Sequence, residues 1–114
     1  MRNDQVYLEH MSENIQIVFE YLAGPAGTPD EDLFYRDRRT QDAVLRRLET
    51  LTDAAGHLSD ALKARHPTVE WSRITGFRNV LAHGYLVTDL SLVWQSVTVD
   101  LPALKAIIQQ ELTQ

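Results

Sequence analysis

Apolar side chains recur along the chain at alternating spacings of three and four residues, the period of one face of an α-helix. Near the N-terminus this stripe consists of Leu8, Met11, Ile15, Val18 and Leu22. The spacing predicts a helix from about residue 4 to about residue 23. Gly24, Pro25 and Gly27 should end it, because proline cannot continue the helical ladder and glycine readily takes the left-handed cap conformation.

The strongest amphipathic pattern lies in the middle of the chain. Over nearly three heptads its apolar positions are Val44, Leu48, Leu51, Ala55, Leu58 and Leu62. We expect this helix to stop near His66, because the residue before a proline is pushed out of helical geometry. A short helix should precede it, with Thr28 as its N-cap and Pro29 at its first helical position.

The last third of the chain predicts further helices. Thr68 can cap a helix whose apolar positions are Trp71, Ile74, Phe77 and Leu81, with Gly84 as a stop or a kink. Asp89 is a plausible N-cap for a segment containing Leu92, Val93 and Trp94, although the β-branched run 96–99 favours a helix only moderately. Asp100 and Pro102 should begin a last helix, with Leu104, Ile107, Ile108 and Leu112 facing inward. Four or five such helices with short loops predict an all-α antiparallel bundle.

The composition is compatible with this fold and limits the number of domains, the compartment and the kind of RNA contact that we expect. The 114 residues are enough for one domain, over residues 1–114, with a single core. The absence of cysteine excludes disulfides and thiolate chemistry, and it fits a reducing compartment. Because neither a signal peptide nor a membrane span is visible, we expect a cytoplasmic protein without a membrane partner. The net charge of −5 argues against general coating of nucleic acid, so any RNA contact should be local.

The candidate chemistry lies on the helix that begins near Trp71. A single histidine is usually structural, but His83 lies on the order of 160–180° from the centre of the buried stripe and shares one helix side with Asn79. Arg78 borders the stripe, so the segment offers a cation, an amide and a group that titrates near neutrality. Those are the groups needed to handle a phosphodiester.

Helical geometry also separates two of these residues. Arg78 and His83 are five positions apart, which is about 140° on an ideal helix. The arginine side chain could wrap round, the backbone could be distorted near Gly84, or a second subunit could complete the site. We favour a second subunit together with a wrapped arginine, and therefore predict a homodimer.

The arrangement of Arg78, His83 and Tyr85 resembles the RxxxxHxY signature of the HepT-like toxins, a branch of the HEPN superfamily. The segments 41–44 and 100–104 and residues Trp71, Gly76 and Trp94 also resemble that family, so the likeness covers most of the chain. It implies a helical, dimeric endoribonuclease that uses neither a metal nor another cofactor. His83 would then act as general base or acid, Arg78 would stabilise phosphoryl charge, and Asn79 would orient the histidine or a phosphate oxygen. A 2′,3′-cyclic phosphate would be the product.

The resemblance also implies a partner. Toxins of this kind are commonly paired with a minimal nucleotidyltransferase antitoxin, in a type VII-like toxin–antitoxin system, which attaches AMP to the motif tyrosine. Tyr85 is the matching position here, although its plain interpretation is an amphipathic side chain at the edge of the core. An AMP group there would bring bulk and negative charge to the place where RNA phosphate must bind. Hetero-oligomers larger than a dimer are compatible with this scheme.

The chain also carries a weaker basic signal, and two other functions are compatible with its pattern. The basic concentration Arg36, Arg38, Arg39, Arg46 and Arg47 could bind an RNA backbone, or it could be an ordinary solvated helix start. No metal site is expected, because His57 and His66 have no ligand at helical spacing. A non-catalytic HEPN nucleotide-binding or scaffold subunit of a nucleotidyltransferase complex is the alternative function. A plain helical dimerisation domain would leave the polar residues around His83 unexplained.

Overall fold

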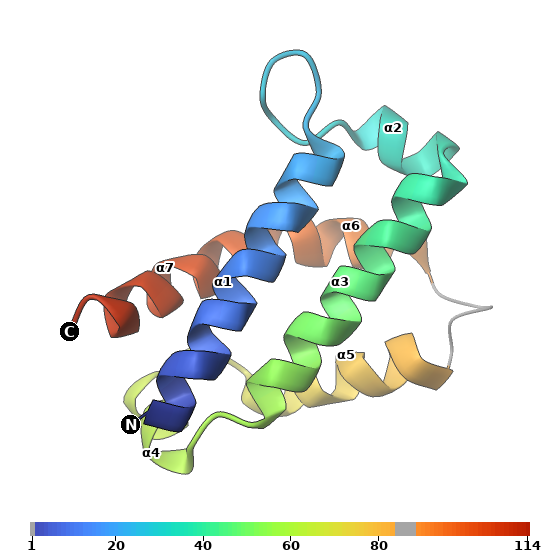
Figure 1. Ribbon diagram of the computed structural model, residues 1–114. Helices are drawn as coiled ribbons and strands as arrows, with labels where there is room; N and C mark the ends of the chain where they lie inside the picture. Colours follow the sequence, from blue (N-terminus) through green and yellow to red (C-terminus); the bar gives the residue numbers. More distant parts are fainter. Residues whose placement is uncertain (1, 84–88) are drawn as a thin grey trace.

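The computed structural model describes residues 2–83 and 89–114, and nearly all of them are helical. The elements are α1 (Arg2–Leu22), α2 (Glu31–Arg36), α3 (Arg38–Gly56), α4 (Asp60–Arg65), α5 (Trp71–His83), α6 (Leu90–Gln95), the π-helical turn η2 (Ser96–Asp100) and α7 (Leu101–Leu112). The two longest helices, α1 and α3, run antiparallel side by side, and α5 packs against α3 while α7 packs against α1 (Figure 1). The predicted all-α bundle is confirmed.

The core lies between these helices and consists of the predicted apolar stripes. All five stripe residues of α1 are at most 4% exposed, from Leu8 to Leu22. Leu48 and Leu51 of α3, Leu81 of α5, and Leu104 and Ile108 of α7 close over them. No helix in the described ranges is long and apolar enough to cross a membrane.

The central amphipathic pattern forms two helices, so the single helix predicted from Val44 to Leu62 is wrong. α3 ends at Gly56, and Ser59 caps α4 by accepting the backbone N–H of Leu62. Buried Asp4 of α1 accepts hydrogen bonds from the Ser59 N–H at 2.8 Å and from its hydroxyl at 2.6 Å. These bonds satisfy groups that a continuous helix would use in its own ladder, so the chain turns there. The predicted stop near His66 is confirmed, because α4 ends at Arg65.

Two predicted N-caps are wrong. Asp30, and not Thr28, caps α2, because the Thr28 carbonyl instead accepts the Gly24 N–H at 2.9 Å and closes the preceding loop. Gly27 occupies that loop with φ of +79°, a conformation in which glycine is strongly favoured. Thr68 does not cap α5, which begins only at Trp71.

The C-terminal helices form one continuous run. Asp89 caps α6 as predicted, and its hydrogen bond from the Ser91 hydroxyl lowers the pKa of the Asp89 carboxyl. α7 begins at Leu101, directly after Asp100 and with Pro102 in its first turn, as predicted. No loop precedes it, because η2 joins α6 to α7 through a π turn in which the Leu101 N–H reaches the Ser96 carbonyl. Pro102 has no N–H to donate, which favours such a shift of the ladder.

Candidate active site

Arg78 lies at the rim of the contact between α5 and α3. Ile74, Phe77 and Leu81 turn the apolar side of α5 toward the core, which leaves Arg78 at the edge of that stripe as predicted. Its side chain is 44% exposed, and its Nη2 atom lies 3.0 Å from Oδ1 of Asp53 on α3. The guanidinium is thus directed toward α3 and still open to solvent.

The rest of the motif is described only in part. α5 carries the backbone of Asn79 and extends to His83, about 7.5 Å along the helix axis from Arg78. The side chains of Asn79 and His83 lie outside the described part of the structure, as do the whole of Gly84 and Tyr85. The structure therefore describes the side chain of Arg78, and the predicted roles of Arg78, Asn79, His83 and Tyr85 all stay predictions.

Sequence analysis missed Asp53. The residue occupies the polar side of the amphipathic α3, where an acidic side chain is unremarkable, and 25 positions separate it from Arg78 in the sequence. Only the packing of α5 against α3 brings the two charges together. No periodicity within one helix could reveal a pair that two helices form.

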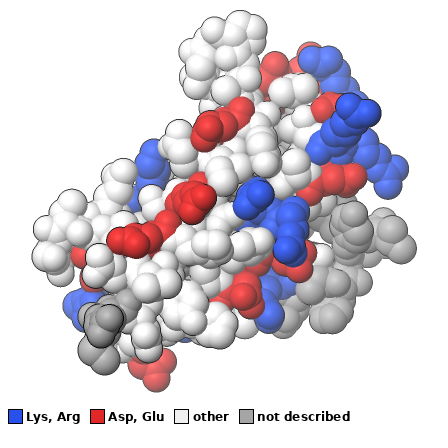
Figure 2. All heavy atoms as spheres, viewed as in Figure 1, with Lys and Arg blue, Asp and Glu red and all other residues white. Residues whose placement is uncertain are grey.

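The five predicted RNA-binding arginines divide into different environments. Arg36, Arg38 and Arg39 are exposed around the junction of α2 and α3, where Figure 2 shows Lys and Arg side chains gathered at the upper right. Arg46 is exposed and lies 3.7 Å from Glu49. Arg47 is half-buried and donates to Asn14 Oδ1 on α1 at 3.4 Å, so it contributes to helix packing.

Three of the charged positions on α3 share one helix face. Arg39, Arg46 and Asp53 follow one another at intervals of seven residues, and a heptad step changes the direction on an α-helix by only about 20°. Since Asp53 holds Arg78, this face leads from the arginines at the α2–α3 junction to the motif arginine. We call the set Arg39, Arg46 and Arg78 the arginine line.

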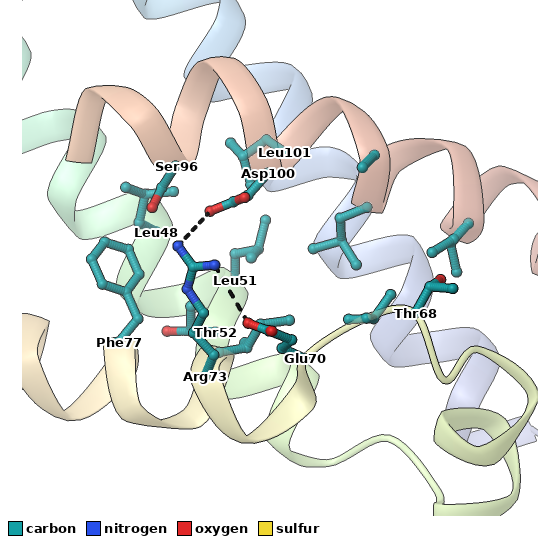
Figure 3. A pocket seen from close by; sticks show the side chains of 15 residues that line it. Leu48, Leu51, Thr52, Thr68, Glu70, Arg73, Phe77, Ser96, Asp100 and Leu101 are labelled. Atoms are coloured by element: carbon teal, nitrogen blue, oxygen red, sulfur yellow. Dashed lines mark hydrogen bonds and ion pairs between the residues drawn. The ribbon is translucent and has the colours of Figure 1, made fainter. Parts of the chain in front are cut away.

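An apolar groove lies on another side of α5. It encloses about 400 Å³ between α3, α5, η2 and α7, with Leu48, Leu51, Phe77 and Leu104 among its apolar lining (Figure 3). Arg73 crosses it and makes ion pairs with Glu70 at 3.4 Å and with Asp100 at 3.8 Å. Two carboxylates outweigh one guanidinium there, so the groove disfavours a phosphate, and Arg78 is not among its lining residues.

A second arginine–carboxylate contact lies at the other end of the molecule. Glu111 of α7 accepts from Arg65 Nη2 at 2.8 Å and lies 2.6 Å from His66 Nε2. Its side chain is only 6% exposed. The hydrogen bond from Arg65, and after it the one from His66, lowers the pKa of the Glu111 carboxyl to about 2. This cluster fastens the end of α7 to the end of α4.

Metal ligands do not gather in the described ranges. Residues 2–83 and 89–114 hold no group of three or more histidine and acidic side chains that could hold a metal ion.

Comparison with known proteins gives one consistent result. The family model "Ribonuclease HepT-like" matches residues 11–111. A Thermococcus cleftensis protein named "Probable ribonuclease HepT" is 33% identical over 91% of this chain and 91% of its own length. A Methanocaldococcus jannaschii protein named "Gamma-glutamylcyclotransferase and putative RNase" is also 33% identical, over 92% of this chain. This chain spans only 46% of that longer protein. No solved structure matches the chain.

Proposed function

Since the chain belongs to the HepT-like ribonuclease family, we propose that it is a metal-independent endoribonuclease whose reaction is carried by Arg78 and His83. The observation that carries the proposal is the placement of Arg78. This arginine is exposed, directed by an ion pair, and located at the end of a basic helix face, five residues before a histidine. A phosphodiester that follows the arginine line would meet a fixed cation and a titratable group together.

The proposed reaction is an internal transfer of the phosphoryl group. The ribose 2′-oxygen attacks the adjacent phosphorus, the bond from phosphorus to the 5′-oxygen breaks, and the products are a 2′,3′-cyclic phosphate and a 5′-hydroxyl. His83 takes the proton from the 2′-hydroxyl or gives one to the departing 5′-oxygen. Arg78 stabilises the charge that grows on the phosphoryl oxygens, for which its planar and permanently charged fork is suited. Asn79 orients the histidine or a phosphate oxygen.

We assign RNA backbone binding to the arginines at the α2–α3 junction and to the arginine line. Arg36, Arg38 and Arg39 would receive phosphates first, and Arg46 lies between them and Arg78 along the arginine line. We leave Arg47 out of the proposed track, because its half-buried side chain donates to Asn14 Oδ1 on α1. With a net charge of −5, the protein has to concentrate its attraction for RNA in such a local track.

A homodimer is part of the proposal, because positions 78 and 83 lie about 140° apart around an ideal helix. If the arginine of one subunit serves the histidine of the other, mixing Arg78→Ala with His83→Ala protein restores activity. About a quarter of the wild-type rate is expected, since half of the dimers are mixed and each of these holds one intact site. Rates that stay at the level of the separate variants would instead show that each subunit carries a complete site.

The proposed regulator is a minimal nucleotidyltransferase antitoxin. In this scheme the Tyr85 hydroxyl attacks the α-phosphate of ATP, pyrophosphate leaves, and the AMP that remains blocks the RNA phosphate site. Mass spectrometry after incubation with such an enzyme and ATP would place the modification. Tyr85→Phe protein should gain no mass, whereas Tyr21→Phe and Tyr35→Phe, which replace exposed tyrosines, should gain as much as the wild type. Neutralisation with an unmodified Tyr85 would indicate simple masking.

One assay tests the enzymatic proposal as a whole. Purified protein is incubated with RNA in EDTA, beside Arg78→Ala and His83→Ala variants, and the 3′ ends of the fragments are identified. Cleavage in the wild type only, with cyclic phosphate ends, supports the proposal. Loss of cleavage on adding EDTA would overturn the metal-independent mechanism. Intact RNA in every lane would favour the non-catalytic scaffold subunit instead.

A further inference from the structure

The carboxylate of Asp53 is an unexpected group in a track for RNA. It lies at the end of the arginine line, 51% exposed, where its charge repels phosphate. If the basic face served only to attract RNA, a neutral or basic residue would serve better at this position. Because Asp53 weakens RNA binding at this point, we expect it to have a function other than attracting RNA.

Fold stability does not supply that role. The contact between α3 and α5 is made by apolar side chains, among them Leu51, Ile74 and Phe77, and not by the surface pair. Ion pairs between exposed side chains contribute little to the free energy of unfolding, because water screens them and both side chains lose mobility. The Asp53–Arg78 pair is of this exposed kind, with exposed fractions of 51% and 44%.

Orientation of Arg78 is the role that remains. An unpaired arginine at a helix surface samples many rotamers, whereas the carboxylate at 3.0 Å from Nη2 selects those that direct the guanidinium toward α3. The contact engages one terminal nitrogen, and a guanidinium presents five N–H donors in a rigid fork. Donors are therefore left over for phosphoryl oxygens while the group is held.

We propose that Asp53 is the positioning residue of the RNA-cleaving site: its carboxylate holds the Arg78 guanidinium in the orientation that receives the scissile phosphate. The inference rests on the proposed ribonuclease function. In this arrangement the Asp53 carboxylate weakens RNA binding and at the same time orders the Arg78 guanidinium. Removal of the carboxylate should therefore change kcat and KM in the same direction, by slowing the reaction and tightening binding.

The test measures steady-state cleavage of one RNA by the wild type, Asp53→Ala, Asp53→Glu and Asp42→Ala. Asp42 is a matched control, since it is exposed on the same helix, eleven residues earlier, and lies within about 20° of the same face. We expect Asp53→Ala to lower kcat about tenfold or more and to lower KM about twofold. Asp53→Glu should recover part of kcat, and Asp42→Ala should lower KM alone.

A second measurement follows Arg78 without any substrate. The NMR relaxation of its side-chain Nε–H reports the mobility of the guanidinium, which should rise in Asp53→Ala and stay unchanged in Asp42→Ala. An unchanged kcat in Asp53→Ala, or a higher one, would overturn the inference while the RNA is still cut. A wild type that cuts no RNA would overturn the proposed function instead, and increased mobility in Asp53→Ala would then show only that the carboxylate orders the arginine.

Discussion

Two arginine–carboxylate pairs of similar length occupy opposite surroundings in this molecule. Arg65 and Glu111 lie 2.8 Å apart with the carboxylate 6% exposed, whereas Arg78 and Asp53 lie 3.0 Å apart with both side chains about half exposed. The first carboxylate is taken out of water, so it depends on its partners and fastens α7 to α4. The second pair remains hydrated and can exchange contacts with a charged ligand. Burial, and not distance, separates a structural pair from a candidate functional one.

The largest expected effect is the loss of RNA cleavage when the motif histidine is replaced. His83→Ala should lower the rate of RNA cleavage at least about 100-fold, because general acid–base catalysis contributes at least that much. His10→Ala is the control, since it replaces a histidine that is exposed on α1, outside the motif. Cleavage rates at equal protein concentration check this. A His83→Ala rate equal to that of His10→Ala would remove the histidine from the mechanism.

Glu111→Gln should give the largest loss of stability at the buried pair. The substitution keeps the shape of the side chain but removes the charge that Arg65 and His66 bind, and we expect the free energy of unfolding to fall by about 2 kcal/mol. Urea unfolding monitored by circular dichroism measures this. Asp53→Asn, the same change at the exposed pair, should cost about 0.5 kcal/mol or less. Equal losses would contradict the distinction by burial.

Acid should act on the buried pair in a defined pH window. The folded-state pKa of Glu111 is about 2, below its ordinary value of 4.5, so its contribution to stability is fully present above pH 4.5 and is lost as pH falls toward 2. Thermal unfolding of the wild type and Glu111→Gln should therefore differ at pH 6 and converge near pH 2. A difference that persists unchanged at pH 2 would show that the charge of Glu111 is not the stabilising feature.

The smallest effect is expected at the α2–α3 junction, where the arginine line begins. Replacing Arg36, Arg38 and Arg39 by glutamine should weaken RNA binding several-fold at low salt and reduce the slope of log Kd against log salt by about 2. It should leave kcat nearly unchanged. Arg47→Gln should not change the slope, because that side chain contacts Asn14 of α1. Equal slopes for the wild type and the triple variant would remove the junction from the RNA path.

Much of the fold could be predicted from the sequence, because each helix carries its own apolar period. The predicted stripe of α1 is buried without exception. α1 ends just before Gly24 and Pro25, and α4 ends just before Pro67, as these residues indicated. The break between α3 and α4 could not be predicted in this way. It depends on Asp4, a residue of another helix that accepts two hydrogen bonds from Ser59. Long-range capping leaves no local signature.

In the candidate site, too, features set within one helix could be predicted, whereas contacts between helices could not. Spacing on one helix correctly placed Arg78 at the edge of the buried stripe, with its side chain in part exposed. Its partner Asp53, and the separation of Arg47 from the other arginines, depend on how α3 meets α5 and α1. Sequence alone also could not foresee Glu111, because a lone acidic residue near a C-terminus resembles an ordinary surface residue until α4 is seen beside it.

The most direct test compares the two arginines by the same substitution. Arg78→Gln and Arg65→Gln proteins are each measured for melting temperature and for RNA cleavage per folded molecule in EDTA. We expect Arg78→Gln to lose cleavage at least about 100-fold with an unchanged melting temperature. Arg65→Gln should melt about 4 °C lower or more and cleave RNA at the wild-type rate. Equal cleavage by the two variants would contradict the assignment of the exposed pair to the chemistry.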